Sequence, residues 1–88
     1  MASFVIKTST NTVDLHGMIV EEALEKMWAF IDQATLRSEY AVMVMHGHGS
    51  GKLKAAVRAA LKNAPYKSLK FRAGAPEEGG DGVTVVMI

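Results

Sequence analysis

Residues 43–54 have the sequence Met43-Val44-Met45-His46-Gly47-His48-Gly49-Ser50-Gly51-Lys52-Leu53-Lys54, and this stretch decides the fold. Its apolar start favours a buried strand, and its polar centre, punctuated by three glycines, favours a tight turn. A helical pattern of apolar residues follows directly. The stretch therefore predicts a strand, a glycine-rich turn and a helix N-terminus in immediate succession.

The turn has the features of an anion-binding site. A helix N-terminus presents backbone N–H groups without intrahelical partners, together with the positive end of the helix dipole. Gly47, Gly49 and Gly51 would let a phosphate approach the backbone beside Ser50, and Lys52 would add positive charge. A Walker A loop would need glycine at position 46 and Ser or Thr at position 53, where His46 and Leu53 stand. A dinucleotide fingerprint would need glycine in place of Lys52, so both motifs are excluded. The alternative is an ordinary glycine-rich turn with solvated histidines.

The whole chain has the size and composition of one small globular domain. Its 88 residues are 49% hydrophobic with a formal net charge of +1, so any basic surface must come from the distribution of charges. The absence of cysteine excludes disulfides, thiolate metal sites and a cysteine nucleophile. No apolar run approaches the roughly 20 residues of a membrane span, and no signal-peptide pattern is present. We expect a cytoplasmic protein that does not bind a membrane.

Strands are predicted at four places in the chain. Residues 1–11 are expected to be an arm or linker from an upstream region, and residues 12–88 the folded domain. Apolar and polar residues alternate in 12–17 and 68–72, whereas 40–45 is a continuous apolar run and 83–88 is strongly β-prone. The run at 40–45 is typical of a central strand.

Two helices separate these strands. Helical spacing of apolar residues runs from Val20 to Ala34 and from Leu53 to Ala64, where Pro65 stops the second helix. The acidic, glycine-rich segment 74–82 has turn composition, and we expect it to be a mobile loop.

The order β-α-β-α-β-β predicts an α/β two-layer sandwich. Two right-handed crossovers in one direction place both helices on the same face of the sheet. Parallel strands end at one edge, where ligands of open α/β sheets collect. Asp14 and His16 end the first strand, and His46 and His48 follow the second. If those strands are neighbours, all three histidines of the chain meet beside the helix that begins near Lys52.

Four motifs, in order, resemble those of the Smr (small MutS-related) domain family, and in particular the version at the C-terminus of bacterial MutS2 proteins. The similarity runs from about Asn11 to Ile88. The motifs are Asp14-Leu15-His16-Gly17, Val20-Glu21-Glu22-Ala23, His46-Gly47-His48-Gly49-Ser50-Gly51 and Gly79-Gly80-Asp81-Gly82-Val83-Thr84-Val85-Val86.

The resemblance implies a fold like the C-terminal domain of translation initiation factor three, with a mixed four-stranded sheet whose last strand is antiparallel. It implies binding of DNA, and of RNA or the ribosome, with endonuclease activity that nicks DNA or cleaves RNA. It also implies an upstream ATPase region and a part in restraint of recombination, DNA repair or ribosome rescue. The alternative is a non-catalytic module that docks on branched DNA or ribosomal RNA.

Phosphodiester cleavage needs a base, a proton donor to the leaving oxygen, and positive charge around the phosphorane. Imidazoles can accept and release protons near neutral pH. We assign the base to His16 or His46, with Asp14 orienting or ionising its neighbour, and the acid or a phosphate ligand to His48. Lys52 and the turn amides would stabilise the developing charge.

Structural roles are the alternative for each of these residues. Asp14 could cap the turn or the first helix, and His16 could be an ordinary hydrogen-bonding residue. A basic row on the second helix, formed by Lys54, Arg58 and Lys62, could be a solvated face. Because the row begins beside the glycine turn, we expect it to contact backbone phosphates, together with Lys70 and Arg72. Such contacts position a nucleic acid without reading its sequence.

A divalent cation is an alternative to a purely protein-based site. Asp14 and a carboxylate from the loop 74–82 could hold Mg²⁺ or Mn²⁺, because hard cations prefer oxygen ligands. The sequence itself requires no cofactor, and it leaves the metal ligands unknown.

Overall fold

The computed structural model describes residues 5–63 and 69–88. Within these ranges the chain forms four strands, two α-helices and two short 3-10 helices. In chain order they are β1 (Thr12–Asp14), α1 (Val20–Leu36), β2 (Ala41–Met45), α2 (Lys52–Lys62), β3 (Lys70–Ala73), η1 (Pro76–Glu78), η2 (Gly80–Gly82) and β4 (Val83–Met87).

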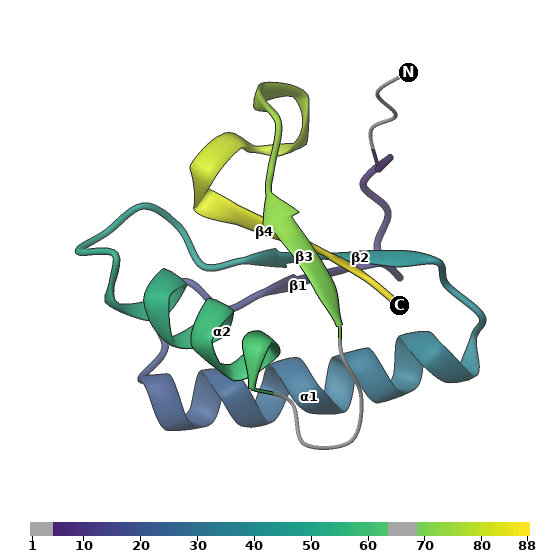
Figure 1. Cartoon of the computed structure of the whole chain (residues 1–88), viewed down its shortest axis with the longest axis horizontal. Helices are drawn as coiled ribbons and strands as arrows, with labels where there is room; N and C mark the ends of the chain where they lie inside the picture. Colours follow the sequence, from purple (N-terminus) through teal and green to yellow (C-terminus); the bar gives the residue numbers. More distant parts are fainter. Residues whose placement is uncertain (1–4, 64–68) are drawn as a thin grey trace.

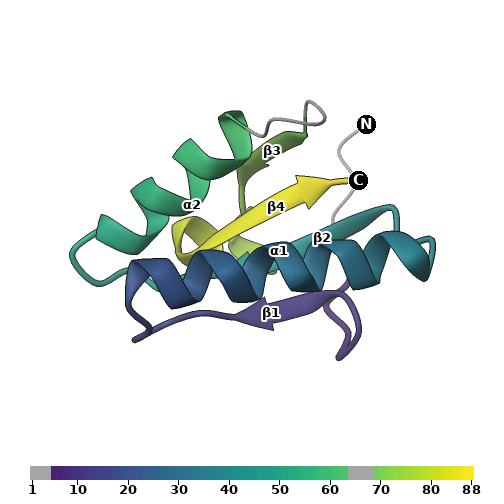
Figure 2. The same cartoon turned by 90° about the horizontal axis from the view of Figure 1, so that it is seen from below.

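The four strands form one mixed sheet in the order β1-β2-β4-β3. β1 and β2 are parallel, and β4 is antiparallel to both β2 and β3, as the resemblance predicted. Both helices lie on the same side of the sheet (Figure 1), and the view from below shows α1 and α2 in front of the strands (Figure 2). The predicted two-layer α/β architecture is therefore confirmed.

The main core lies between the helices and the sheet. Val42 and Val44 of β2 and Val86 of β4 face this layer and are fully buried. The predicted apolar stripes of both helices pack against them, which confirms the helical periodicity read from the sequence. The buried helix residues are Ala23, Met27, Ile31, Ala34, Val57 and Leu61.

Several element boundaries differ from those predicted, most of them by one or two residues. β1 ends at Asp14 and not at residue 17, because the chain turns where Met18 N–H donates to the carbonyl of Leu15 and Gly17 takes a φ of +77°. β3 begins at Lys70 and extends one residue beyond its predicted end. The predicted strand start at residue 68 and the helix stop at Pro65 lie outside the described residues.

The segment 74–82 is ordered by specific contacts, so the expectation of a mobile loop is wrong. It forms η1 and η2, and the side chain of Glu78 is fully buried within it. The carboxylate accepts two hydrogen bonds from the Arg72 guanidinium, at 2.6 and 2.8 Å. It also accepts the backbone N–H groups of Ala75, at 2.8 Å, and Val5, at 2.7 Å. The pKa of this carboxyl falls to about 2, mainly because Arg72 donates to the charged form.

The second face of the sheet carries a smaller apolar cluster. Met43 of β2 and Val83 and Val85 of β4 are buried there together with Val5. Glu78 holds the backbone of Val5 at this face. The described part of the predicted N-terminal arm therefore begins as a segment packed on the sheet. Among the described residues, neither helix combines the length and the apolar character that crossing a bilayer requires.

Candidate functional site

The carboxyl ends of β1 and β2 bring the predicted site residues to one edge of the sheet. Asp14 is paired with Met45 in the parallel ladder, and Leu15 N–H donates to the Met45 carbonyl at 2.7 Å. The segments that follow the two strands therefore leave the sheet side by side. A Cβ atom on Gly47 would lie 3.4 Å from Cβ of His16, so the turn after β2 contacts the residue that follows β1. The predicted meeting of these segments is confirmed.

Asp14 and His16 form a hydrogen-bonded pair on this edge. Nδ1 of His16 lies 2.6 Å from Oδ1 of Asp14, and the same oxygen accepts the backbone N–H of His16 at 3.1 Å. These hydrogen bonds, the imidazole bond first, hold the pKa of the Asp14 carboxyl below its ordinary value, so Asp14 is ionised at neutral pH. The carboxylate favours a proton on Nδ1. None of the hydrogen bonds within the described residues involves Nε2 of His16, which can therefore face a substrate.

His46 has a different environment from the other two histidines. It is 5% exposed, and its ring lies between Gly47 O, 3.1 Å from Nδ1, and Thr84 Oγ1, 2.8 Å from Nε2. Burial, with the nearby charges of Arg58 and Lys54, lowers the pKa of His46. The neutral ring donates from Nδ1 to the Gly47 carbonyl and accepts the Thr84 hydroxyl at Nε2. Both nitrogens are thus used to fix the start of the turn.

The buried imidazole predicts a pH dependence of stability. Because the pKa of His46 is lower in the folded than in the unfolded chain, the unfolded state binds more protons below about pH 6.5. We expect the free energy of unfolding to fall as the pH drops below that value, with a contribution from His46 of up to about 1.4 kcal/mol per pH unit. His46→Gln should be less stable at neutral pH and should show a shallower slope. Urea unfolding at a series of pH values measures both, and equal slopes in the two proteins would contradict the assignment.

The C-terminal loop supports the turn from the other side. The carbonyl of Gly82 accepts the N–H groups of His46, at 3.1 Å, and Gly47, at 3.0 Å. The exposed His48 ring lies over Gly82, where an added Cβ would be 3.0 Å from Nε2. A side chain at position 82 would therefore have to shift the exposed imidazole of His48 by a few tenths of an ångström.

Two hollows adjoin at the turn, and they divide the predicted site residues between them. The larger is a cleft of about 420 Å³ between residues 17–21 and residues 46–54. The smaller, of about 190 Å³, is lined by Asp14, His16 and His48 together with Gly82. Gly47 and His48 line both hollows. The predicted single site is therefore two adjoining sites, one at the start of α2 and one at the Asp14–His16 pair.

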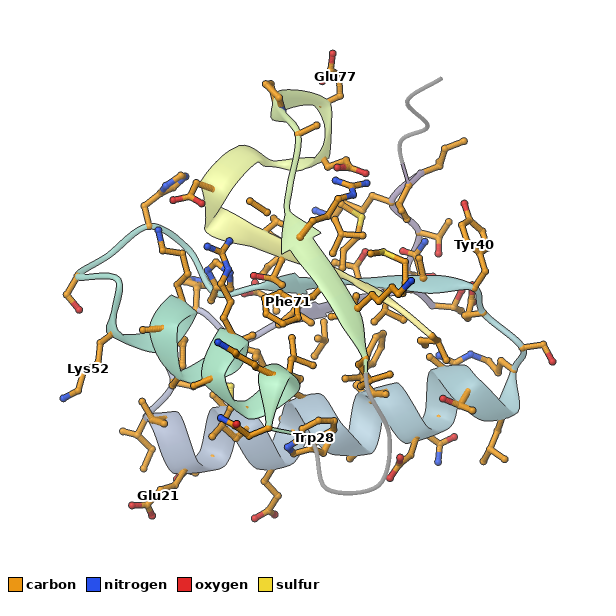
Figure 3. The ribbon with its side chains drawn as sticks, in the orientation of Figure 1. Glu21, Trp28, Tyr40, Lys52, Phe71 and Glu77 are labelled. Carbon is orange, nitrogen blue, oxygen red and sulfur yellow. The ribbon has the colours of Figure 1, made fainter. Side chains whose placement is uncertain are left out.

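The start of α2 has the glycine-rich turn that the sequence predicted, and its binding of an anion stays a prediction. Gly47, Gly49 and Gly51 have φ values of +77°, +29° and +82°, a region that favours glycine. Gly51 is the N-cap and supplies no side-chain cap, and Ser50 Oγ accepts the N–H of Lys52 at 3.3 Å. Lys52 projects from this end of the helix into solvent (Figure 3).

The other predicted phosphate contacts are placed less uniformly. Lys54 lines the cleft, and Lys54 and Arg58 both make ion pairs with Asp81. Lys70 and Arg72 lie on the edge strand β3, which β2 and β4 separate from β1, and Arg72 forms the ion pair with Glu78. Two strands therefore lie between Lys70 or Arg72 and the strand that leads to His16, and the contact of these two residues with a nucleic acid stays a prediction.

A family model, described as the Smr domain, matches residues 13–88 of this chain. The chain belongs to the Smr domain family. The endonuclease MutS2 of Aquifex aeolicus is 48% identical over 79 residues, which are 89% of this chain and 10% of that protein. The chain thus spans about a tenth of the length of the curated relatives it matches.

Solved structures of Smr proteins share the fold. The crystal structure of the Smr domain of Thermus thermophilus MutS2 superposes with a TM-score of 0.80 at 36% identity, covering 88% of this chain and 95% of that one. YdaL, a stand-alone small MutS-related protein from Escherichia coli, has a TM-score of 0.81 at 23% identity, covering 92% of this chain and 66% of that one, and shows the fold alone.

Three carboxylates near the proposed Mg²⁺ or Mn²⁺ site are already engaged by groups of this Smr domain. Glu78 is held by Arg72, Asp81 by Lys54 and Arg58, and Asp14 by His16. Among the described residues, no group of three His, Asp or Glu side chains has the arrangement of a metal site. The cation alternative, which joined Asp14 to a carboxylate of the loop 74–82, stays a prediction.

Three residues that support the site of the Smr domain were not predicted from the sequence. Thr84 bonds the ring of His46, Gly82 holds the turn, and Asp81 pairs with the basic row. For Thr84 the sequence did offer a signal, because it is the single polar residue in the apolar run 83–88. The pairings across the fold are not encoded in any local pattern.

Proposed function

We propose that this Smr domain is a nucleic-acid-binding endonuclease domain that nicks DNA and can cleave RNA. The observation that carries the proposal is the Asp14–His16 hydrogen bond at 2.6 Å on the edge that also holds the glycine turn. An imidazole oriented by a carboxylate is a common arrangement for a general base. The relatives named endonuclease MutS2 support the same reading.

His16 is the proposed base. Asp14 holds the proton on Nδ1, which leaves Nε2 to take a proton from water in DNA cleavage, or from the ribose 2′-hydroxyl in RNA cleavage. His48 lines the same hollow and is the proposed proton donor to the leaving oxygen, or a phosphate ligand. We assign His46 to positioning the turn, because both of its ring nitrogens face groups of the protein.

The α2 cleft is the proposed site for a phosphate next to the one that reacts. The amides at the start of α2, the hydroxyl of Ser50 and the charge of Lys52 suit a phosphodiester. Since His48 and Gly47 line both hollows, one nucleic-acid strand could contact the cleft and the Asp14–His16 pair together.

A non-catalytic docking module is the second candidate. The His16 side chain is 72% exposed, so this domain by itself does not surround its proposed base with the water-excluding walls that strengthen catalysis. In this version the same surface would bind branched DNA or ribosomal RNA. In either version we propose that the domain works in a MutS2-like protein with an upstream ATPase region, in restraint of recombination, DNA repair or ribosome rescue.

Incubation of the purified chain with supercoiled plasmid and with RNA separates the two candidates. Endonuclease activity predicts relaxed plasmid or shortened RNA that disappears in the Asp14 and His16 variants. Cutting that survives those substitutions would place the activity elsewhere, and binding without cutting would favour the docking module. A parallel series with EDTA tests whether a free divalent cation is needed.

Lys52→Ala is expected to weaken nucleic-acid binding. Loss of one phosphate contact should lower the slope of log affinity against log salt by about 1. The matched control is Arg37→Ala, which removes the same charge from an exposed residue at the C-terminal end of α1. Fluorescence anisotropy with labelled DNA at several salt concentrations gives the two slopes, and equal changes in both variants would remove Lys52 from the interface.

A further inference from the structure

The basic row on α2 is already paired with a carboxylate of the protein. Lys54 Nζ forms an ion pair with Oδ2 of Asp81, and a terminal nitrogen of Arg58 lies 3.4 Å from Oδ1. The two oxygens of one carboxylate thus face two different cations, which stand one helical turn apart. A phosphodiester also presents two charged oxygens, and Lys and Arg bind either group.

Arg58 is held in position by a contact that does not involve Asp81. Its Nε donates to Thr84 Oγ1 at 3.0 Å, and the same hydroxyl bonds the ring of His46. Thr84 is fully buried in β4. The guanidinium is therefore anchored to the sheet, and its terminal nitrogens remain directed at the same point if the carboxylate leaves.

Asp81 is the outermost member of this cluster. Its side chain is 56% exposed, against 28% for Lys54 and 26% for Arg58. Lys54 also lines the cleft at the start of α2, so the cluster continues the proposed phosphate surface. The hydrogen bond from Lys54 lowers the pKa of the Asp81 carboxyl, which is charged at neutral pH. An incoming anion therefore meets a negative group in front of two positive ones.

We infer, on the basis of the proposed nucleic-acid binding, that Lys54 and Arg58 form one site for a backbone phosphate and that Asp81 fills this site in the free domain. Binding then exchanges one anion for another at the same pair of cations. Asp81 therefore lowers the affinity of the domain for nucleic acid, because a backbone phosphate must displace its carboxylate from Lys54 and Arg58.

Neutralising Asp81 tests this exchange. We expect Asp81→Asn and Asp81→Ser each to bind a short labelled single-stranded DNA about three- to tenfold more tightly than the parent chain at low salt, as loss of two exposed ion pairs would allow. The gain in affinity should vanish when Lys54 and Arg58 are both replaced by alanine, because Asp81 and the phosphate then have no shared cations to compete for. Using two replacements keeps the test valid if one of them disturbs the loop.

Glu77→Gln is the matched control. It removes the same charge from the same loop, at a side chain that projects from the outer tip (Figure 3) and is exposed. Equal gains for the Asp81 and Glu77 variants would overturn the inference and leave nucleic-acid binding intact. A loss of affinity in the Asp81 variants would also overturn it, since Asp81 would then be holding the cations in place. Failure of the parent chain and of every variant to bind would instead overturn the proposed function.

Discussion

Replacing His16 with alanine is expected to lower the rate of phosphodiester cleavage by about 10²- to 10⁴-fold, the usual contribution of a general base. That range corresponds to roughly 3–5 kcal/mol of transition-state stabilisation. The substitution should leave the fold intact, because the His16 side chain is 72% exposed and bonds only Asp14 within the described residues. Initial rates of plasmid nicking and RNA cleavage measure the effect.

Asp14→Asn separates orientation from proton transfer in the same assay. An amide oxygen can still accept from Nδ1, but the charge that stabilises the protonated imidazole is lost. We therefore expect a smaller fall in rate than for His16→Ala, with binding of nucleic acid retained. Unchanged cleavage in both variants would remove the pair from the mechanism.

Replacing Glu78 with glutamine is expected to destabilise the domain by up to about 3 kcal/mol, the value implied by a fall of the carboxyl pKa from 4.5 to about 2. The carboxylate is fully buried and bonds the Arg72 side chain and the backbone of Ala75 and Val5. A small domain has only about 5–15 kcal/mol of stability in total. The variant should therefore unfold at markedly lower urea concentration. Glu77→Gln, on the exposed neighbouring residue, should change stability by less than about 0.5 kcal/mol.

The pH dependence identifies the ionised form as the stabilising one. The pKa of Glu78 is about 2 in the folded chain against 4.5 in a model peptide, so the folded state favours the carboxylate. Its stabilisation is complete above pH 4.5 and is lost as the pH falls toward 2. The difference in unfolding free energy between the parent and Glu78→Gln should shrink over this interval. A difference that stays constant would show that packing, and not charge, explains the loss.

Arg72 provides a second check on this ion pair. Arg72→Met would leave the carboxylate buried without its cation, and we expect it to be destabilising as well. The double variant Glu78→Gln with Arg72→Met should lose less than the sum of the two single losses, because each single variant leaves a partner unpaired. Strict additivity would contradict a direct ion pair.

Local pattern was sufficient to predict the layers of the fold and the edge that carries the site. The helical spacing of Ala23, Met27 and Ile31 specified a buried face, and the apolar run in β2 specified a central strand. Given that β1 and β2 are parallel neighbours, Asp14 and the His46 turn had to leave the same edge. These predictions depend only on the periodicity of the apolar residues and on the direction in which the strands run.

The parts that failed depend on contacts between distant segments. Glycine and acidic residues in the segment 74–82 gave the composition of a loop, yet Glu78 is buried because Arg72 and the N–H of Val5, 73 residues away, meet its charge. His46 and His16 are the same residue type at the same edge. Thr84, from the last strand, and the Gly47 carbonyl face the two ring nitrogens of His46, whereas, within the described residues, Nε2 of His16 stays open.

The position of β4 has a consequence for how the domain is made. β4 follows every other element in sequence, yet it lies between β2 and β3 and pairs with both. Until synthesis has passed Met87, β3 has no neighbouring strand and β2 pairs only with β1. A chain stalled in translation before β4 would lack the strand that joins β2 to β3, and we expect its incomplete sheet to be exposed to chaperones and proteases.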